Sequence, residues 1–513
     1  MGESMDSCSI FLALLFVTVS LAIFLFRLPS SERNGKGKAR RRLPPGPLPL
    51  PIIGNIHQLG FNFAYIVPSL RRIRARYGPV FRLYLGNQTV VFITSRDLAH
   101  QALVQMGAAL AGRPLSPASA RIVNLNQHSI NSADYGPLWR LFRRNLMAET
   151  LNPGRTKAFS EGRRWVMDVL RDRLQDEAEQ SGGVVAPIGA FHYAMFCLLL
   201  FMCFGEKLDE VTVRKVENPL RDLLVNLTRF NLLGFFPWLS KIFFRRRWHH
   251  LAELKRNEVE TLLPLIRARL GVEQKNWFCY ADSLLTLEHP EGRRLSEGEI
   301  ATLCGEFLNA GTDTTSTVLQ WVMANLVRSP KIQAKLYSEV VSVVGDREEV
   351  AEEELTQMPY LKAVILEALR RHSPGQLLLP HAATEEGVSV AGYHIPKNAT
   401  VNFVVGDMAL DEEVWKDPME FRPERFMPGG EGEDVDITGT TEVKMIPFGA
   451  GRRICPGMGL AVLHLQYYVA NLVREFEWSV VDGEEIDLTE KVEFTVVMKH
   501  PLRARLAPRN RPQ

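Results

Sequence analysis

One cysteine of the sequence stands in a loop whose composition can support metal chemistry. Residues 447–457 are Pro-Phe-Gly-Ala-Gly-Arg-Arg-Ile-Cys-Pro-Gly, with Cys455 near the end. The three glycines let the backbone turn tightly and approach a flat ligand closely. They also leave backbone N–H groups free to bond a sulfur anion, and Arg453 can pair with a carboxylate. An apolar helical pattern follows, and a helix N-terminus stabilises a thiolate.

These features favour a thiolate that ligates an ion over the alternative, a buried cysteine that acts as a small hydrophobe. Haem iron is an ion that a single cysteine thiolate holds, and the thiolate's push of electron density favours O–O cleavage. The other cysteines are scattered and form no CxxC pair, so zinc-site spacing is absent and no disulfide framework is expected. They are Cys8, Cys197, Cys203, Cys279 and Cys304.

The complete Phe-x-x-Gly-x-Arg-x-Cys-x-Gly pattern resembles the haem-binding loop of the cytochrome P-450 superfamily. The resemblance covers nearly the whole chain and looks like a plant-type microsomal member. It implies haem b as the cofactor, with its iron ligated by Cys455. It also implies that Phe448 shields the sulfur, that Arg453 meets a haem propionate and that Gly457 lies at the cofactor.

A second segment, residues 307–315, lies inside a long helical pattern although it holds Gly and Thr, which are poor helix formers. Ala310 and Gly311 would let a haem plane pack close to the helix. Asp313 and Thr314 would form an acid–alcohol pair that delivers protons. Without the cysteine loop, a kinked core helix with threonines bonded to the backbone would be the better interpretation. With it, the segment resembles the superfamily's oxygen-activation motif.

Three further residues are predicted to contact the haem propionates. Trp139 and Arg143 are one helical turn apart and resemble the superfamily's Trp-x-x-x-Arg helix. His381 stands where the superfamily often has a His or Arg at a propionate. The alternative for His381 is a core histidine with satisfied hydrogen bonds.

A charged network is predicted to brace the scaffold. Glu367 and Arg370 lie at i and i+3 on one helix face, which by itself indicates only a surface ion pair. The superfamily adds a third partner from a Pro-Glu-Arg-Phe segment, and residues 423–426 match that segment here. The resemblance therefore implies a buried, structural network of Glu367, Arg370 and Arg425, which is costly unless fully paired.

The N-terminus has the composition of a membrane anchor. Residues 7–26 carry no charge and are apolar all round, and about 20 such residues span a bilayer. A cleaved signal peptide would have a basic start and a shorter apolar run. The basic residues instead follow the apolar run, which predicts a single-pass anchor with a cytoplasmic catalytic domain on the endoplasmic reticulum. We assign residues 1–42 to the anchor and basic linker, and residues 43–51 to a stiff Pro-rich spacer.

The remainder, residues 43–513, is predicted to be a single haem-thiolate domain, mainly α with a smaller β-rich lobe. Residues 80–94 have the pattern of a β-hairpin around Gly-Asn. Most of residues 138–367 is helical in pattern, and short strands are expected between residues 377 and 405. Residues 191–204 are strongly apolar but short, which favours a buried core helix over a membrane span.

Two surface features leave alternatives open. Residues 235–244 are rich in aromatic and apolar side chains and precede three arginines. They suit either a membrane interface or ordinary core beside a charged helix end. The net charge of +3 is too small to indicate a nucleic-acid partner.

The resemblance implies a monooxygenase of plant secondary metabolism that inserts one oxygen atom from O2 into a small lipophilic substrate. An NADPH-dependent haemoprotein reductase would supply the electrons. The segments expected to wall the substrate are mostly apolar. They are residues 111–126, 230–238, 307–311 and 376–379 and the surroundings of Phe494. One rival is an enzyme of the same fold that rearranges or dehydrates its substrate without O2, and another is a non-catalytic haem-binding or sensor protein. The intact Asp313–Thr314 pair argues against both.

Overall fold

The computed structural model describes residue 18 and residues 42–59, 66–86, 88–235, 237–271 and 277–509, with backbone alone between residues 227 and 239. Within these ranges, no helix is long and apolar enough to cross a membrane. The predicted anchor, residues 7–26, lies outside the described residues apart from Thr18.

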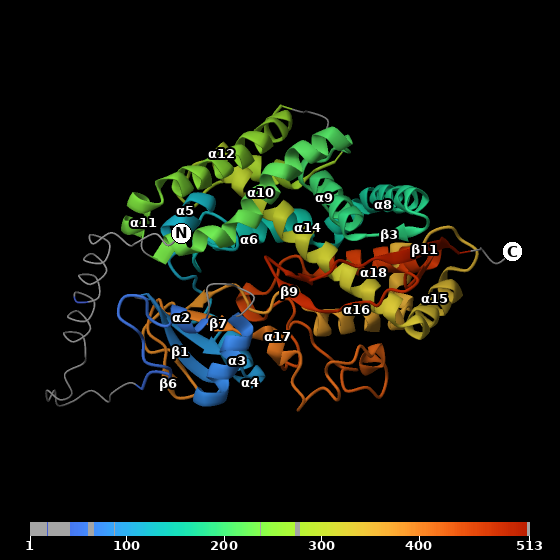
Figure 1. Ribbon diagram of the computed structural model, residues 1–513. Coiled ribbons are helices and arrows are strands. Elements are labelled where there is room, and N and C mark those ends of the chain that lie inside the picture. Colours follow the sequence, from blue (N-terminus) through green and yellow to red (C-terminus); the bar gives the residue numbers. More distant parts are fainter. Residues whose placement is uncertain are drawn as a thin grey trace, which may run out of the picture.

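One long helix, α14 (Glu297–Arg328), crosses the middle of the molecule (Figure 1). It begins with a capping box, in which the Glu299 carboxylate accepts from the Ser296 N–H at 2.8 Å while Ser296 caps the Glu299 N–H. The helices packed against it are α9 (Ile188–Phe204), α10 (Glu210–Phe235), α12 (Arg245–Ala268), α13 (Tyr280–Leu285), α15 (Pro330–Val344), α16 (Pro359–Arg371) and α18 (Met458–Glu475).

The core helix predicted at residues 191–204 is confirmed. In α9 every residue from Ala190 to Phe204 is buried, because the helix packs against α14, α10 and α8 (Ser160–Gln180). It ends at Gly205, whose φ of 75° suits a glycine C-cap. A helix apolar on all sides is stable in water only when neighbours cover all of it.

The β-rich lobe lies at the lower left of Figure 1, where strands from residues 80–93 and from residues 381–403 meet. β1 (Val80–Leu85) and β2 (Gln88–Ile93) form the predicted antiparallel hairpin, with Val80 opposite Ile93. β7 (Thr400–Phe403) pairs with β2 in parallel, and β4 (His381–Ala382) completes the order β1-β2-β7-β4. Strands were predicted between residues 377 and 405, and the sheet confirms them.

The smaller elements complete the domain around this frame. Of three further sheets in the described residues, one joins β3 (Val184–Val185), β11 (Ala504–Pro508) and β8 (Phe476–Ser479), and another joins β9 (Glu490–Val492) with β10 (Val496–Met498). The rest are α2 (Ile56–Leu59), α3 (Ile66–Tyr77), α4 (Arg96–His100), η2 (Gln101–Gln105), α5 (Ala118–Val123), α6 (Pro137–Leu146), η3 (Met147–Leu151), α7 (Pro153–Ala158), α11 (Pro237–Phe243), η4 (Glu352–Gln357), β5 (Ser389–Val390), β6 (Tyr393–His394), α17 (Val405–Met408), η5 (Pro423–Phe426) and η6 (Gly451–Arg453).

The charged network predicted from α16 and η5 is present and fully buried. Arg370 Nε lies 2.7 Å from Glu367 Oε2, and Arg425 Nε lies 3.3 Å from Glu367 Oε1. All three side chains are 0% exposed. The remaining guanidinium N–H groups donate to the carbonyls of Ala409 and Pro418, among others. Because the charges are paired and their hydrogen bonds made, the network ties α16 to the chain that leads to the cysteine loop.

Candidate haem-thiolate site

The cysteine loop folds back on itself directly before α18. The Cys455 N–H donates to the Phe448 carbonyl at 2.8 Å, which closes the loop. Gly449 and Gly451 have φ values of 73° and 67°, in the region that favours glycine. A Cβ on Gly451 would lie 1.9 Å from the Leu103 carbonyl oxygen, so only glycine lets the loop pack on η2.

The Cys455 thiol differs from the other described thiols in its exposure. Cys197, Cys203, Cys279 and Cys304 are buried, whereas Cys455 is only half-buried. Burial raises the pKa of Cys455, while the Gly457 N–H and the charge of Arg143 lower it. The two groups that favour the thiolate are therefore already in place beside the sulfur.

Two arginines line the same region and donate to backbone carbonyls. Arg453 donates from Nε to Ala111 at 2.8 Å and from Nη2 to Ala133 at 2.8 Å. Arg113, which the sequence analysis did not single out, donates from Nη1 to the Pro380 carbonyl at 2.8 Å. Burial, followed by the charge of Arg113, lowers the pKa of Arg453 to about 9. Burial also lowers the pKa of Arg113 to about 10.

The predicted propionate contacts gather around these arginines. Trp139 is buried, and the Arg453 guanidinium lies 4.5 Å from its ring centroid. Arg143 lies one helical turn after Trp139 on α6, and burial lowers its pKa. The Nδ1–H of His381 donates to the Leu110 carbonyl at 2.8 Å. Burial, followed by the charge of Arg113, lowers the pKa of His381 to about 3, so its ring is neutral.

This donor set fits haem b. Three partly desolvated guanidinium groups, those of Arg113, Arg143 and Arg453, all have lowered pKa values, and the first and last donate to neutral carbonyls. A dianionic ligand would restore their pKa values and provide charged acceptors. The two propionates of haem are such groups, and Cys455 offers a thiolate to the iron. Phe448, half-buried in the same loop, packs against the main core.

α14 runs past this region with its polar segment. Ala310 is exposed although Leu308 and Thr312 on either side are buried, so Ala310 marks the face on which a flat ligand can lie. Thr314, on the same face, donates its hydroxyl to the Ala310 carbonyl at 2.8 Å. A Cβ on Gly311 would lie 2.8 Å from Leu199 of α9. The missing side chain of Gly311 therefore permits helix packing, and a contact of its backbone with haem stays a prediction.

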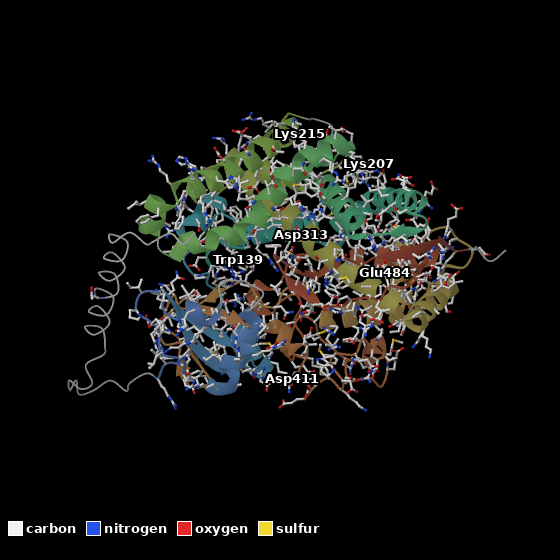
Figure 2. The ribbon with its side chains drawn as sticks, viewed as in Figure 1. Trp139, Lys207, Lys215, Asp313, Asp411 and Glu484 are labelled. Carbon is white, nitrogen blue, oxygen red and sulfur yellow. The ribbon has the colours of Figure 1, made fainter. Side chains whose placement is uncertain are left out.

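The acid of the predicted acid–alcohol pair has its own partner. Asp313 Oδ1 lies 3.3 Å from Nε2 of His192 on α9. The sticks in Figure 2 place Asp313 and Trp139 in the middle of the view, with Lys215 at the top and Asp411 at the bottom. Asp313 thus points towards α9, while the hydroxyl of Thr314 bonds its own helix.

Another residue of the site, Glu306 of α14, was missed by the sequence analysis. Its carboxylate accepts from the N–H groups of Ile130 at 2.8 Å and Asn131 at 2.7 Å. It thereby holds the loop whose carbonyls bind Arg113 and Arg453. Burial raises the pKa of Glu306 to about 6. Glu306 and Arg113 match no local motif, because their partners are distant in sequence.

Comparison with known proteins identifies the family. The family model Cytochrome P450 matches residues 44–507. The chain is 45% identical to Cytochrome P450 89A9 of Arabidopsis thaliana, over 90% of this chain and 93% of that one. It is 33% identical to Flavonoid 3'-monooxygenase CYP75B137 of Crocosmia x crocosmiiflora, over 90% and 91%. A zebra fish cytochrome P450 structure with progesterone superposes with a TM-score of 0.74 at 22% identity, covering 85% of this chain and 97% of that one.

A fold and site of this kind define a haem-thiolate oxidoreductase. The chain belongs to the cytochrome P450 family. Its fold is the P450 fold, mostly helical with a small β region. Its cofactor is haem b with a cysteine thiolate on the iron, and its reaction class is the incorporation of one oxygen atom.

Replacing Arg113 with glutamine is expected to loosen the haem. A hydrogen bond to a charged group contributes about 1.5–3 kcal/mol, so haem should leave roughly 10- to 100-fold faster. The rate is measured by transfer of haem to an excess of an apo-globin. Arg121→Gln, an exposed arginine of α5, is the matched control. Equal rates of haem loss from Arg113→Gln and from the unsubstituted protein would show that Arg113 does not help to hold the haem.

Proposed function

We propose that this chain is a membrane-anchored P450 monooxygenase of the endoplasmic reticulum. It inserts one oxygen atom into a small lipophilic substrate with electrons from an NADPH-dependent haemoprotein reductase. The observation that carries the proposal is the juxtaposition of the half-buried Cys455 thiol with guanidinium groups that have no charged acceptor among the described residues. α18, which follows Cys455, packs against α14, the helix that carries the acid–alcohol segment.

In this mechanism the protein positions substrate and delivers protons. Haem, when bound, supplies the binding and reductive activation of O2. The Thr314 hydroxyl stands on the face marked by Ala310 and can hold a water there. Asp313, on the adjacent side of α14, passes protons towards that water. Reduced O2 needs two protons to release one oxygen as water, so their timing decides between product and hydrogen peroxide.

The apolar character of the expected substrate walls supports a lipophilic substrate. Leu379 and Phe494 are large apolar side chains with exposures of 56% and 51%. A cavity of about 780 Å³ opens between α5 and α12, with the apolar Ile122 and Leu125 in its wall beside charged groups such as Lys255 and Glu260. From α14 it is lined by Gly298, at the start of that helix and N-terminal to the acid–alcohol segment. We propose it as part of the substrate's route.

Replacing Thr314 with alanine is expected to uncouple reductant consumption from product formation. General acid catalysis contributes at least about 100-fold to a proton-dependent step, so product per reductant should fall strongly and peroxide should rise. Both are measured per reductant oxidised, with a substrate chosen by spectral screening of lipophilic metabolites. Thr312→Ala removes a hydroxyl with the same bond to its own helix, but at a buried position. If the ratio of product to oxidised reductant is unchanged in Thr314→Ala, Thr314 has no role in proton delivery and serves only the structure of the helix. Rearrangement of a hydroperoxide without O2 would favour the rival enzyme.

Removing residues 1–42 is expected to weaken membrane association and to leave haem binding intact. The family match begins at residue 44, beyond the proposed anchor. Sedimentation with membranes and haem content per protein measure the two effects. A soluble truncated protein that cannot bind haem would overturn the division into residues 1–42 and 43–513. Residual binding would support a second contact at Ile242 and Phe243, which are 66% and 72% exposed.

A further inference from the structure

A histidine stands between the acid of α14 and the outer helix α10. His192 of α9 is 9% exposed. Its Nε2 lies 3.3 Å from Asp313 Oδ1, and its Nδ1 lies 2.8 Å from Glu217 Oε1. One imidazole ring therefore joins a carboxylate of α14 to a carboxylate of α10.

A third charged group, Arg221, lets the His192 ring form hydrogen bonds in both its neutral and its protonated state. Arg221 Nη1 lies 3.1 Å from His192 Nε2, and a guanidinium can only donate. When the ring is neutral, Nε2 accepts from Arg221. When the ring is protonated, Nε2–H donates to Asp313. In both states Nδ1–H donates to Glu217, so the states differ by one proton at Nε2.

We infer that His192 is the proton-relay residue that supplies Asp313 and holds its carboxylate towards α9. The inference rests on the proposed monooxygenase function and acts through Asp313. In the relay step the Nε2–H bond breaks and an O–H bond forms on Asp313, so the imidazolium becomes neutral and the carboxylate becomes an acid. Arg221 then donates a hydrogen bond to Nε2, until a hydronium ion from the solvent returns a proton to that nitrogen and leaves as water.

On the side of His192 away from Asp313, the charged groups extend to the protein surface. Glu217 Oε2 pairs with Arg214 Nη1 at 2.8 Å, and the Arg214 side chain is 44% exposed. Among the described residues, the charged groups that face the ring are Glu217 and Arg221 from α10 and Asp313 from α14. α8, which also packs on α9, places its Arg173 over Tyr193 instead.

The electrostatics of the site favour the protonated form of the His192 ring. Burial lowers the pKa of His192, but its bonds to Asp313 and Glu217 outweigh that effect and the net pKa is raised. The charge of Arg221 lowers it. Removing a carboxylate should therefore lower the pKa of His192, and removing Arg221 should raise it.

The first test follows the His192 ring itself in the full-length haem protein. Histidine-labelled protein is titrated by nitrogen-15 NMR, and His192→Gln identifies the resonance. Asp313→Asn is expected to lower the pKa of His192 by about one unit, and Arg221→Gln to raise it by a similar amount. Lys215→Gln removes a charge from α10 at the edge of the molecule (Figure 2) and should leave the pKa unchanged. If the pKa of His192 is the same in Asp313→Asn as in the unsubstituted protein, the inference is overturned.

The second test separates a relay from a purely structural role. The glutamine of His192→Gln can keep one hydrogen bond but cannot carry a proton. Its reductant-driven coupling is expected to drop several-fold with a larger solvent isotope effect, while turnover driven by hydrogen peroxide persists. Equal coupling at every pH would contradict the relay. If the unsubstituted protein oxygenates nothing with either oxidant, the proposed function fails, whereas the NMR result would stand independently.

Discussion

Cys455→Ala is expected to abolish reductant-driven oxygenation, the largest effect on activity that the structure predicts. Among the described cysteines, only Cys455 is half-buried and has the Gly457 N–H and the charge of Arg143 to favour a thiolate. Burial raises the pKa of Cys197 and Cys279 to about 12, which disfavours a thiolate at both positions.

The measurement is reductant-dependent O2 uptake and product, together with haem content per protein. Cys304→Ala, which removes a buried thiol from α14, is the matched control and should keep both its oxygenation activity and its haem content. Residual coupled turnover in Cys455→Ala would mean that another group ligates the iron.

Glu367→Ala is expected to destabilise the folded domain more than any other single change considered. It would leave Arg370 and Arg425, both 0% exposed, without their shared carboxylate. Breaking a buried ion pair from one side costs about 3–5 kcal/mol, a large part of the roughly 5–15 kcal/mol that holds a typical domain folded. Thermal unfolding and the yield of haem-loaded protein measure the loss.

The matched control lies in the same Pro-Glu-Arg-Phe segment. Glu424 pairs with Lys335 at 2.7 Å, and both side chains are about half exposed. Exposed pairs contribute about 0–1 kcal/mol, so Glu424→Ala should change stability little. If Glu367→Ala lowered the stability of the folded domain as little as Glu424→Ala does, the network would not brace the scaffold.

Local motifs made part of the site predictable from sequence. The cysteine loop and the Glu-x-x-Arg pair lie within short stretches, where fixed spacing sets geometry. Gly451 illustrates this, because its positive φ and its contact with Leu103 allow no other residue. The hairpin at residues 80–94 was predictable for the same reason, since alternating polarity and a turn specify it.

Contacts between distant segments escaped the sequence analysis. His192 lies in the apolar helix Ile188–Phe204, where its pattern indicates only core. Its partners Glu217 and Asp313 come from two other helices, and only packing brings them together. Gly311 adds a packing role that the sequence did not indicate, because a Cβ there would meet Leu199 of α9, while its contact with haem stays a prediction.

The Soret band of the reduced, carbon monoxide-treated full-length protein tests the central claim most directly. Thiolate opposite carbon monoxide moves this band strongly to the red, whereas a nitrogen or oxygen ligand does not. We expect the red-shifted band in the unsubstituted protein and in Cys304→Ala, and its loss in Cys455→Ala. A red-shifted band that survives in Cys455→Ala, or that is missing from the unsubstituted protein with full haem content, would contradict ligation of the haem iron by Cys455.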